Sequence, residues 1–227
     1  MYKSLTLSFV LKAAEAASGT FNYDDIGANW PDHTPLCGTG KEQSPIDLVH
    51  EGDFVKKVSG SEIKFEGYDY KDYAQGAVLD RKDHTVQMGV DAGQLRTVFP
   101  DGDGSTFNAL QLHFHAPSEH TVNGKYMDLE MHVVHLHDSG TRFSVLGFMF
   151  DVEEGGNSEN EFLKSIAVEK APATTADPGT PLVDANLATF LAGVDMKKFW
   201  HYDGSFTTPP CTEGVEWLVM EQVQPIS

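Results

Sequence analysis

The sequence predicts a single α+β domain dominated by sheet: a large, mostly antiparallel, twisted β-sheet with short peripheral helices. Short β-rich runs separated by Gly or Asp recur from Ile63 onward, at a spacing typical of antiparallel strands. Helical spacing of apolar residues appears in only two segments, both in the last third of the chain. The length of 227 residues favours one large domain over two small ones.

The N-terminal residues 1–20 carry a short apolar-leaning run and then an Ala-rich stretch. Because Lys12 and Glu15 interrupt the pattern, the segment is either a targeting segment or a frayed N-terminal helix. The segment from Phe21 to Ile46 is dense in turn formers and is expected to be an irregular coat over the core. The folded domain is expected to span residues 21–227.

Alternating or apolar runs predict four strands, over Thr85–Met88, Leu110–His115, Leu129–Leu136 and Phe143–Phe150. Helices are predicted over Glu161–Ile166 and Ala185–Leu191. A Pro- and Thr-rich loop from Ala171 to Pro181 separates the two helices.

The composition is acidic, with 34 Asp and Glu against 16 Lys and Arg and a formal net charge of −18. This field repels a phosphate backbone, so nucleic acid is not an expected partner. No run reaches the ~18 consecutive apolar residues of a membrane helix, so no membrane span is expected. The acidity indicates either a solvated surface or adaptation to salt, which would screen the self-repulsion.

Cys37 and Cys211 are the two cysteines of the chain. They cannot form a zinc site of the Cys-x-x-Cys kind. They are therefore either two buried thiols or one disulfide, and a disulfide would imply an oxidising compartment.

Histidines gather in one part of the chain. Six of the ten fall between residues 113 and 137, where even spacing would place about one. Strand alternation puts the imidazoles of His113 and His115 on one face. If the strand over Leu129–Leu136 pairs with theirs, His132 lies beside them. Three neutral imidazoles and one open position are the ligand set of a catalytic zinc site.

A lone His-x-His motif is more often a surface feature than a metal site. Here the third histidine favours metal binding, as do Gln111 and Glu130, which are polar residues at same-face positions in apolar strands. Ligand imidazoles need an acceptor for their second N–H, and these two residues supply one. His135 falls on the opposite face and, with His137, is interpreted as an ordinary core or surface residue.

Several motifs, in order along nearly the whole chain, resemble the α-class carbonic anhydrases. They are Phe21-Asn22-Tyr23 with Trp30, then Gln43–Leu48, Gln111–Thr121, Glu130–His135 and Tyr202–Cys211. The compact loop from His115 to His120 is more similar to bacterial, algal or plant members. The resemblance implies a zinc lyase, a carbonate dehydratase that converts CO₂ to bicarbonate and a proton by zinc-hydroxide attack, with a side esterase activity.

By this resemblance, His113, His115 and His132 hold Zn²⁺, and Gln111 and Glu130 support them. Thr207 accepts a hydrogen bond from the hydroxide and donates its own hydroxyl hydrogen to Glu119. The residues that match the CO₂ site are Val134, Val145, Phe206, Thr208, Val215 and Trp217. Phe206 is bulkier than the leucine common there.

His84 matches the family's proton-shuttle histidine, and an unperturbed imidazole pKa near 6.5 suits that role. Tyr23 and Gln87 match residues that order the connecting waters, whereas Lys82 replaces a polar residue often found there. Strand alternation would place His84 on the face opposite Thr85 and Gln87, unless the strand begins or bulges at this point.

Cys37 and Cys211 match positions that are paired in extracellular members, which implies a disulfide and a secreted, periplasmic or organelle-lumen location. Family members continue past Gln224–Ser227, so the chain is expected to be a fragment, a processed chain with a complementary C-terminal chain, or a shortened variant. A second copy of the chain, in a homodimer, is the alternative partner. The alternative function is a carbonic-anhydrase-like zinc-binding or storage protein with weak or no hydratase activity, but such proteins usually lack a ligand histidine.

Overall fold

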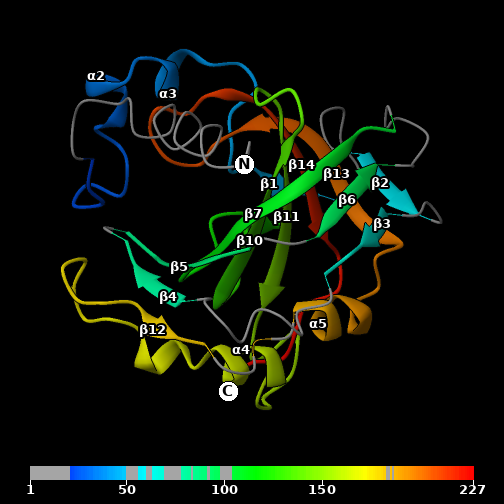
Figure 1. Cartoon of the computed structure of the whole chain (residues 1–227). Coiled ribbons are helices and arrows are strands. Elements are labelled where there is room, and N and C mark those ends of the chain that lie inside the picture. The colour runs from blue at the N-terminus through cyan, green and yellow to red at the C-terminus, as the bar shows by residue number, and fades with distance from the viewer. Residues whose placement is uncertain are drawn as a thin grey trace.

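The computed structural model describes residues 21–49, 56–59, 63–68, 78–82, 84–90, 93–97, 104–182, 185 and 187–227. Residues 1–20, interpreted as either a targeting segment or a frayed N-terminal helix, lie outside the described residues. A twisted sheet forms the centre of the described structure, and short helices lie at its margins (Figure 1). The prediction of a sheet-dominated α+β fold is confirmed.

The large sheet has the strand order β12-β4-β5-β7-β10-β11-β14-β13-β2, and β3 and β6 extend it beside β7. Its strands are β2 (Lys56–Ser59), β3 (Ile63–Glu66), β4 (Val78–Arg81), β5 (Val86–Gly89), β6 (Gln94–Thr97), β7 (Thr106–His115), β10 (Leu129–His137), β11 (Phe143–Phe150), β12 (Thr180–Pro181), β13 (Lys198–Ser205) and β14 (Glu213–Met220). Among these pairs, only β11 with β14 is parallel. The sheet is therefore mixed but mostly antiparallel, as predicted.

A second, small sheet joins β1 (Asp47–Leu48), β8 (Thr121–Val122) and β9 (Lys125–Tyr126). The described helices are α2 (Trp30–His33), α3 (Leu36–Thr39), α4 (Glu161–Ile166), α5 (Leu187–Gly193) and the 3₁₀ helix Val168–Lys170. In α4, the Asn160 side chain accepts hydrogen bonds from the backbone N–H groups of Phe162 and Leu163, which caps the helix start. The predicted bounds of β11 and α4 are confirmed.

Three predicted segments are corrected. The coat from Phe21 to Ile46 contains the single-turn helices α2 and α3, because prolines near their starts preset a helical φ. The helix predicted from Ala185 lies at Leu187–Gly193 instead. Within the predicted loop, Thr180 and Pro181 pair with β4 as an edge strand, where a proline is tolerated.

Apolar side chains pack on both faces of the central strands. One core contains Leu112, Phe114, Met131 and Val133 with residues of α4 and α5. A second core on the opposite face contains Val134, Val145 and Trp217. Because β7 and β10 lie between two packed layers, their polar side chains are held in a mostly dry interior.

The N-terminal coat is tied to the start of β14. Cys37 and Cys211 form a disulfide with an S–S distance of 2.03 Å. Oε1 of Glu213 accepts hydrogen bonds from the backbone N–H groups of Lys41 and Glu42 and from Nε2 of Gln43. Two independent links therefore hold this coat against the loop that precedes β14.

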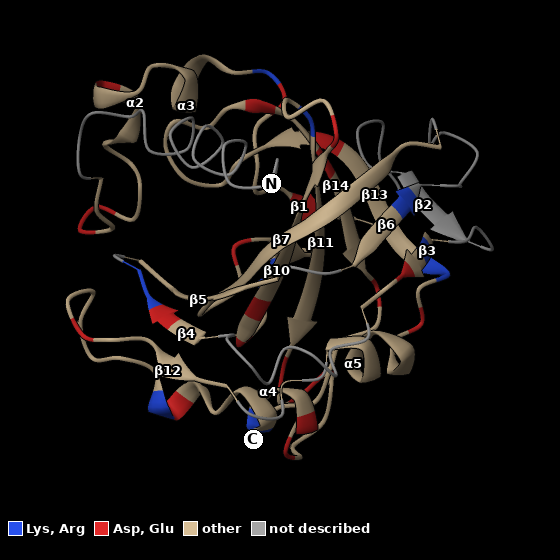
Figure 2. Ribbon diagram, viewed as in Figure 1, with Lys and Arg blue, Asp and Glu red and all other residues tan. Residues whose placement is uncertain are grey.

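Acidic residues are spread over separate elements of the described ribbon, with few basic residues between them (Figure 2). None of the described helices is long and apolar enough to cross a bilayer.

Candidate active site

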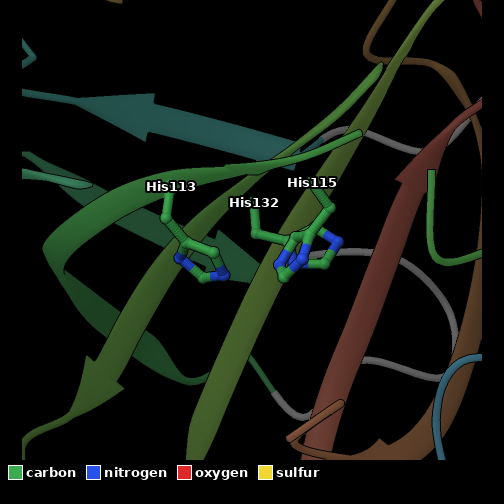
Figure 3. A group of neighbouring side chains, drawn as sticks. All are labelled: His113, His115 and His132. Carbon is green, nitrogen blue, oxygen red and sulfur yellow. The ribbon is translucent and has the colours of Figure 1, made fainter. Parts of the chain in front are cut away.

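Two neighbouring strands bring three histidines together. His113 and His115 lie on β7, and His132 lies on β10 directly opposite His113 in the antiparallel register. Figure 3 shows the three rings gathered in one place. One ring nitrogen of each histidine lies within 4.8 Å of the other two. Strand alternation and this register together place three nitrogen donors around one point.

Neighbouring side chains determine which nitrogens remain free for a metal. Nδ1 of His113 lies 2.8 Å from Oε1 of Gln111, and Nε2 of His132 lies 2.8 Å from Oε1 of Glu130. Nε2 of His115 is buried and has no hydrogen-bond partner. The nitrogens left to face one ion are therefore Nε2 of His113, Nε2 of His115 and Nδ1 of His132.

The rings of His113 and His115 are in a protonation state that can bind a metal. Burial lowers the pKa of His113 well below its usual value and that of His115 to about 3. Both imidazoles are therefore neutral at neutral pH, which is the form that coordinates metals. Three imidazole nitrogens, one of them a buried atom without a hydrogen-bond partner, fit a zinc ion with an open fourth position.

The sequence matches the family model described as eukaryotic-type carbonic anhydrase over residues 26–227. The chain belongs to the α-carbonic anhydrase family. It is 36% identical to alpha carbonic anhydrase 4 of Arabidopsis thaliana over 86% of this chain and 66% of that protein, just under two thirds of its length. It is 31% identical to a carbonic anhydrase of Pectobacterium atrosepticum over 96% of this chain and 83% of that protein. The solved α-carbonic anhydrase of Photobacterium profundum superposes with a TM-score of 0.68 at 31% identity, covering 92% of this chain and 87% of that one.

Behind His132, this carbonic anhydrase chain carries a buried network that sequence reasoning missed. Oε1 of Glu130 lies 2.7 Å from Nδ1 of His120, whose Nε2 lies 2.5 Å from the hydroxyl of Tyr202. The Tyr202 hydroxyl lies 2.9 Å from Oγ of Ser44. His120 counted toward the histidine cluster in the sequence, but its partner Tyr202 is 82 positions away. No local signal joins the two.

Glu119 and Thr207 lie together at the histidine cluster. Burial raises the pKa of Glu119 to about 8, and a hydrogen bond from the Thr207 side chain opposes this shift. Oε1 of Glu119 lies 3.3 Å from Nδ1 of His115. Thr207 is buried, with 8% of its surface exposed. The structure thus brings the predicted pair together beside His115.

The residues predicted to line a CO₂ site share one apolar cluster. Val134, Val145, Val215 and Trp217 are buried in it, and Phe206 packs against it while half-buried. The Trp217 ring lies 4.8 Å from the His132 ring, centroid to centroid. Thr208, also predicted here, is half-buried in the adjoining loop, where its carbonyl accepts a hydrogen bond from the Cys211 N–H.

His84 precedes β5, which begins at Val86 and not at Thr85 as predicted. Strand alternation therefore does not determine the direction of the His84 side chain. Its ring lies 4.0 Å from the Phe21 ring and 5.3 Å from the Tyr23 ring, centroid to centroid. On β5, Gln87 is the direct partner of His113.

Other residues named in the sequence analysis lie apart from His113, His115 and His132. Lys82 is exposed, and its Nζ lies 3.6 Å from a carboxylate oxygen of Asp80. Nε2 of the buried His135 lies 2.5 Å from the hydroxyl of Tyr68. Nδ1 of His137 lies 2.9 Å from Oγ of Ser139.

Proposed function

We propose that this chain is a zinc enzyme that interconverts CO₂ and bicarbonate. The observation that supports this most is the convergence of three imidazole nitrogens beside an apolar cluster and a Thr–Glu pair. His113 and His115 would hold the ion through Nε2, and His132 through Nδ1. When bound, zinc makes a hydroxide nucleophile available near neutral pH, chemistry for which carbonic anhydrases are themselves the standard example.

Gln111 and Glu130 keep the ligand rings in one orientation. Each accepts a hydrogen bond from the ring nitrogen that does not face the ion, which fixes the tautomer of His113 and of His132. Glu130 is fully buried, and burial alone would raise its pKa. The nearby His120 and His132 instead hold that pKa well below its usual range, so Glu130 stays a charged acceptor.

Thr207 orients the attacking water-derived oxygen. Its hydroxyl donates its hydrogen to the Glu119 carboxyl group, so the hydroxyl oxygen remains available as an acceptor. An oxygen that donates to Thr207 points its lone pair away from the threonine and toward the substrate. Glu119 thus acts on the reaction through Thr207.

The apolar cluster binds the substrate. CO₂ has no net dipole, so its transfer from water to an apolar surface is favourable. Val134, Val145, Val215 and Trp217 supply that surface. Phe206 packs edge-on against Phe143, with ring centroids 4.9 Å apart, and so adds a second aromatic surface to this cluster. Thr208 follows Thr207 in the same loop and is proposed to contact the substrate.

His84 carries the released proton to buffer. An unperturbed imidazole takes up and gives back a proton near neutral pH, which suits this role, and Tyr23 and Gln87 are proposed to order the waters that connect His84 to the centre. Side esterase activity, a complementary chain and a homodimer stay predictions.

The disulfide between Cys37 and Cys211 supports a secreted, periplasmic or organelle-lumen location, since such bonds persist in oxidising compartments. We propose residues 21–227 as one catalytic domain.

Stopped-flow CO₂ hydration by the zinc-loaded chain tests the proposed function. Wild-type protein should accelerate hydration, and His115→Ala, which removes one nitrogen donor, should abolish the zinc-dependent part. Zinc-loaded protein with no hydratase activity would instead support the alternative of a zinc-binding or storage protein.

A further inference from the structure

The Thr85 hydroxyl makes two hydrogen bonds to a single residue of the ligand strand. Its Oγ1 accepts a hydrogen bond from the Phe114 backbone N–H at 3.1 Å and donates one to the Phe114 carbonyl at 2.6 Å. Phe114 lies between His113 and His115 on β7. One side-chain hydroxyl therefore satisfies both backbone polar groups of the residue between two ligand histidines.

The hydrogen bonds between Thr85 and Phe114 lie where the backbone pairing of β5 with β7 ends. The ladder runs through Gly89↔Gln111 and Met88↔Leu112 and has its last pair at Gln87↔His113. Both backbone groups of a strand residue point toward the same neighbouring strand, and for Phe114 that neighbour is β5. The Thr85 side chain thus takes the place of the next backbone pair and extends the attachment to the residue beside His84.

His84 is held from two directions. Its backbone adjoins Thr85, which is fixed to β7, and its ring packs on Phe21 with centroids 4.0 Å apart. Proton transfer through water depends on the donor, the waters and the acceptor staying in one arrangement. A displacement of Thr85 would move His84 relative to the ligand strand without touching a ligand histidine directly.

We propose that Thr85 is a positioning residue that holds His84 at a fixed place relative to the ligand strand through its hydrogen bonds to Phe114. This inference rests on the proposed function and on His84 as the proton shuttle. A merely structural threonine would affect hydration and proton export alike, whereas a positioning residue affects mainly proton export.

The test compares Thr85→Val, which keeps the β-branched shape and loses the hydroxyl, with Thr85→Ser, which keeps the hydroxyl. Thr106→Val, at the far end of β7, is the matched control. In dilute buffer we expect kcat of Thr85→Val to fall at least about threefold while kcat/KM for CO₂ stays within about twofold. Added imidazole should restore kcat, and Thr85→Ser should resemble wild type.

Amide hydrogen exchange in the metal-free protein gives a readout that is independent of activity. The Phe114 N–H should exchange about fivefold faster in Thr85→Val, the factor expected for one lost hydrogen bond, and should be unchanged in Thr85→Ser and Thr106→Val.

Unchanged kcat in Thr85→Val, or an equal fall of kcat and kcat/KM that imidazole does not restore, would overturn the inference. Unchanged Phe114 exchange would do the same. Failure of the proposed function would give another result: the zinc-loaded wild-type chain would show no hydratase activity. The exchange of the Phe114 N–H would still report whether the Thr85 hydrogen bonds form.

Discussion

The Glu130 carboxylate lies 2.8 Å from Nε2 of His132, the ring nitrogen that does not face the proposed metal. The same carboxylate lies 2.7 Å from Nδ1 of His120 and accepts hydrogen bonds from the backbone N–H groups of Glu119 and His120. Glu130 thus links His132 on β10 to the loop that carries Glu119.

We expect Glu130→Ala to lower zinc affinity, because His132 would lose the acceptor that fixes its tautomer. The loss should be about 10- to 100-fold, measured by competition with a chromophoric chelator. Glu221→Ala, a change outside the histidine cluster, is the comparison. Equal zinc affinity of Glu130→Ala and wild type would contradict this role.

Thr207→Val should lower kcat/KM for CO₂ about 100-fold, because valine keeps the shape but cannot accept a hydrogen bond from the attacking oxygen. Zinc content should not change. The exposed Thr212 lies in the same loop, and Thr212→Val should stay within about twofold of wild type. A Thr207→Val enzyme as active as this control would rule out the orienting role.

Breaking the disulfide should destabilise the fold. Cys37 and Cys211 are 174 positions apart, so the link removes much chain entropy from the unfolded state, worth about 5 kcal/mol on the chain-entropy model. Denaturant unfolding with and without reductant measures the loss. The double variant Cys37→Ser/Cys211→Ser should unfold at the same denaturant concentration with and without reductant. A wild-type unfolding midpoint that is equal in the two conditions would refute the prediction.

His135 should make the metal-free protein sensitive to acid. Burial lowers its pKa to about 4 in the folded state, while the unfolded chain takes up the proton near pH 6.5. The unfolded state binds more protons between these values, so stability present above pH 6.5 falls by about 1.4 kcal/mol per pH unit toward pH 4.

His135→Gln keeps a polar partner for Tyr68 but does not titrate. The other titrating groups are the same in wild type and His135→Gln. As the pH falls from 6.5 to 4.5, the unfolding free energy of wild type should therefore fall relative to that of His135→Gln, by about 1.4 kcal/mol per pH unit. A difference independent of pH would show that His135 does not titrate in this way.

Local patterns predicted the strands that carry the three histidines, β7 and β10. A period of two residues is enough to place Gln111, His113 and His115 on one face, and their contacts agree with it. His132 lies beside them only if the two strands pair, and the sequence alone did not establish that pairing. The register that sets His132 opposite His113 comes from packing between distant segments.

Features that depend on contacts between residues far apart in the chain were not predicted from the sequence. The link from His120 to Tyr202 joins a loop to β13 and has no local pattern. The start of β5 at Val86 was also missed, because Thr85 has a strand-forming side chain but uses its hydroxyl to bind the backbone of Phe114. The helices α2 and α3 are single turns, too short to show a period.

His113, His115 and His132 are proposed to hold one zinc ion, and the roles of the other site residues depend on it. Elemental analysis of purified protein after dialysis against zinc and then buffer tests it most directly, with the double variant His113→Ala/His132→Ala beside wild type. We predict about one zinc per wild-type chain and less than about a tenth of that in the variant. Equal zinc in both proteins, or no stoichiometric zinc in wild type, would contradict the claim.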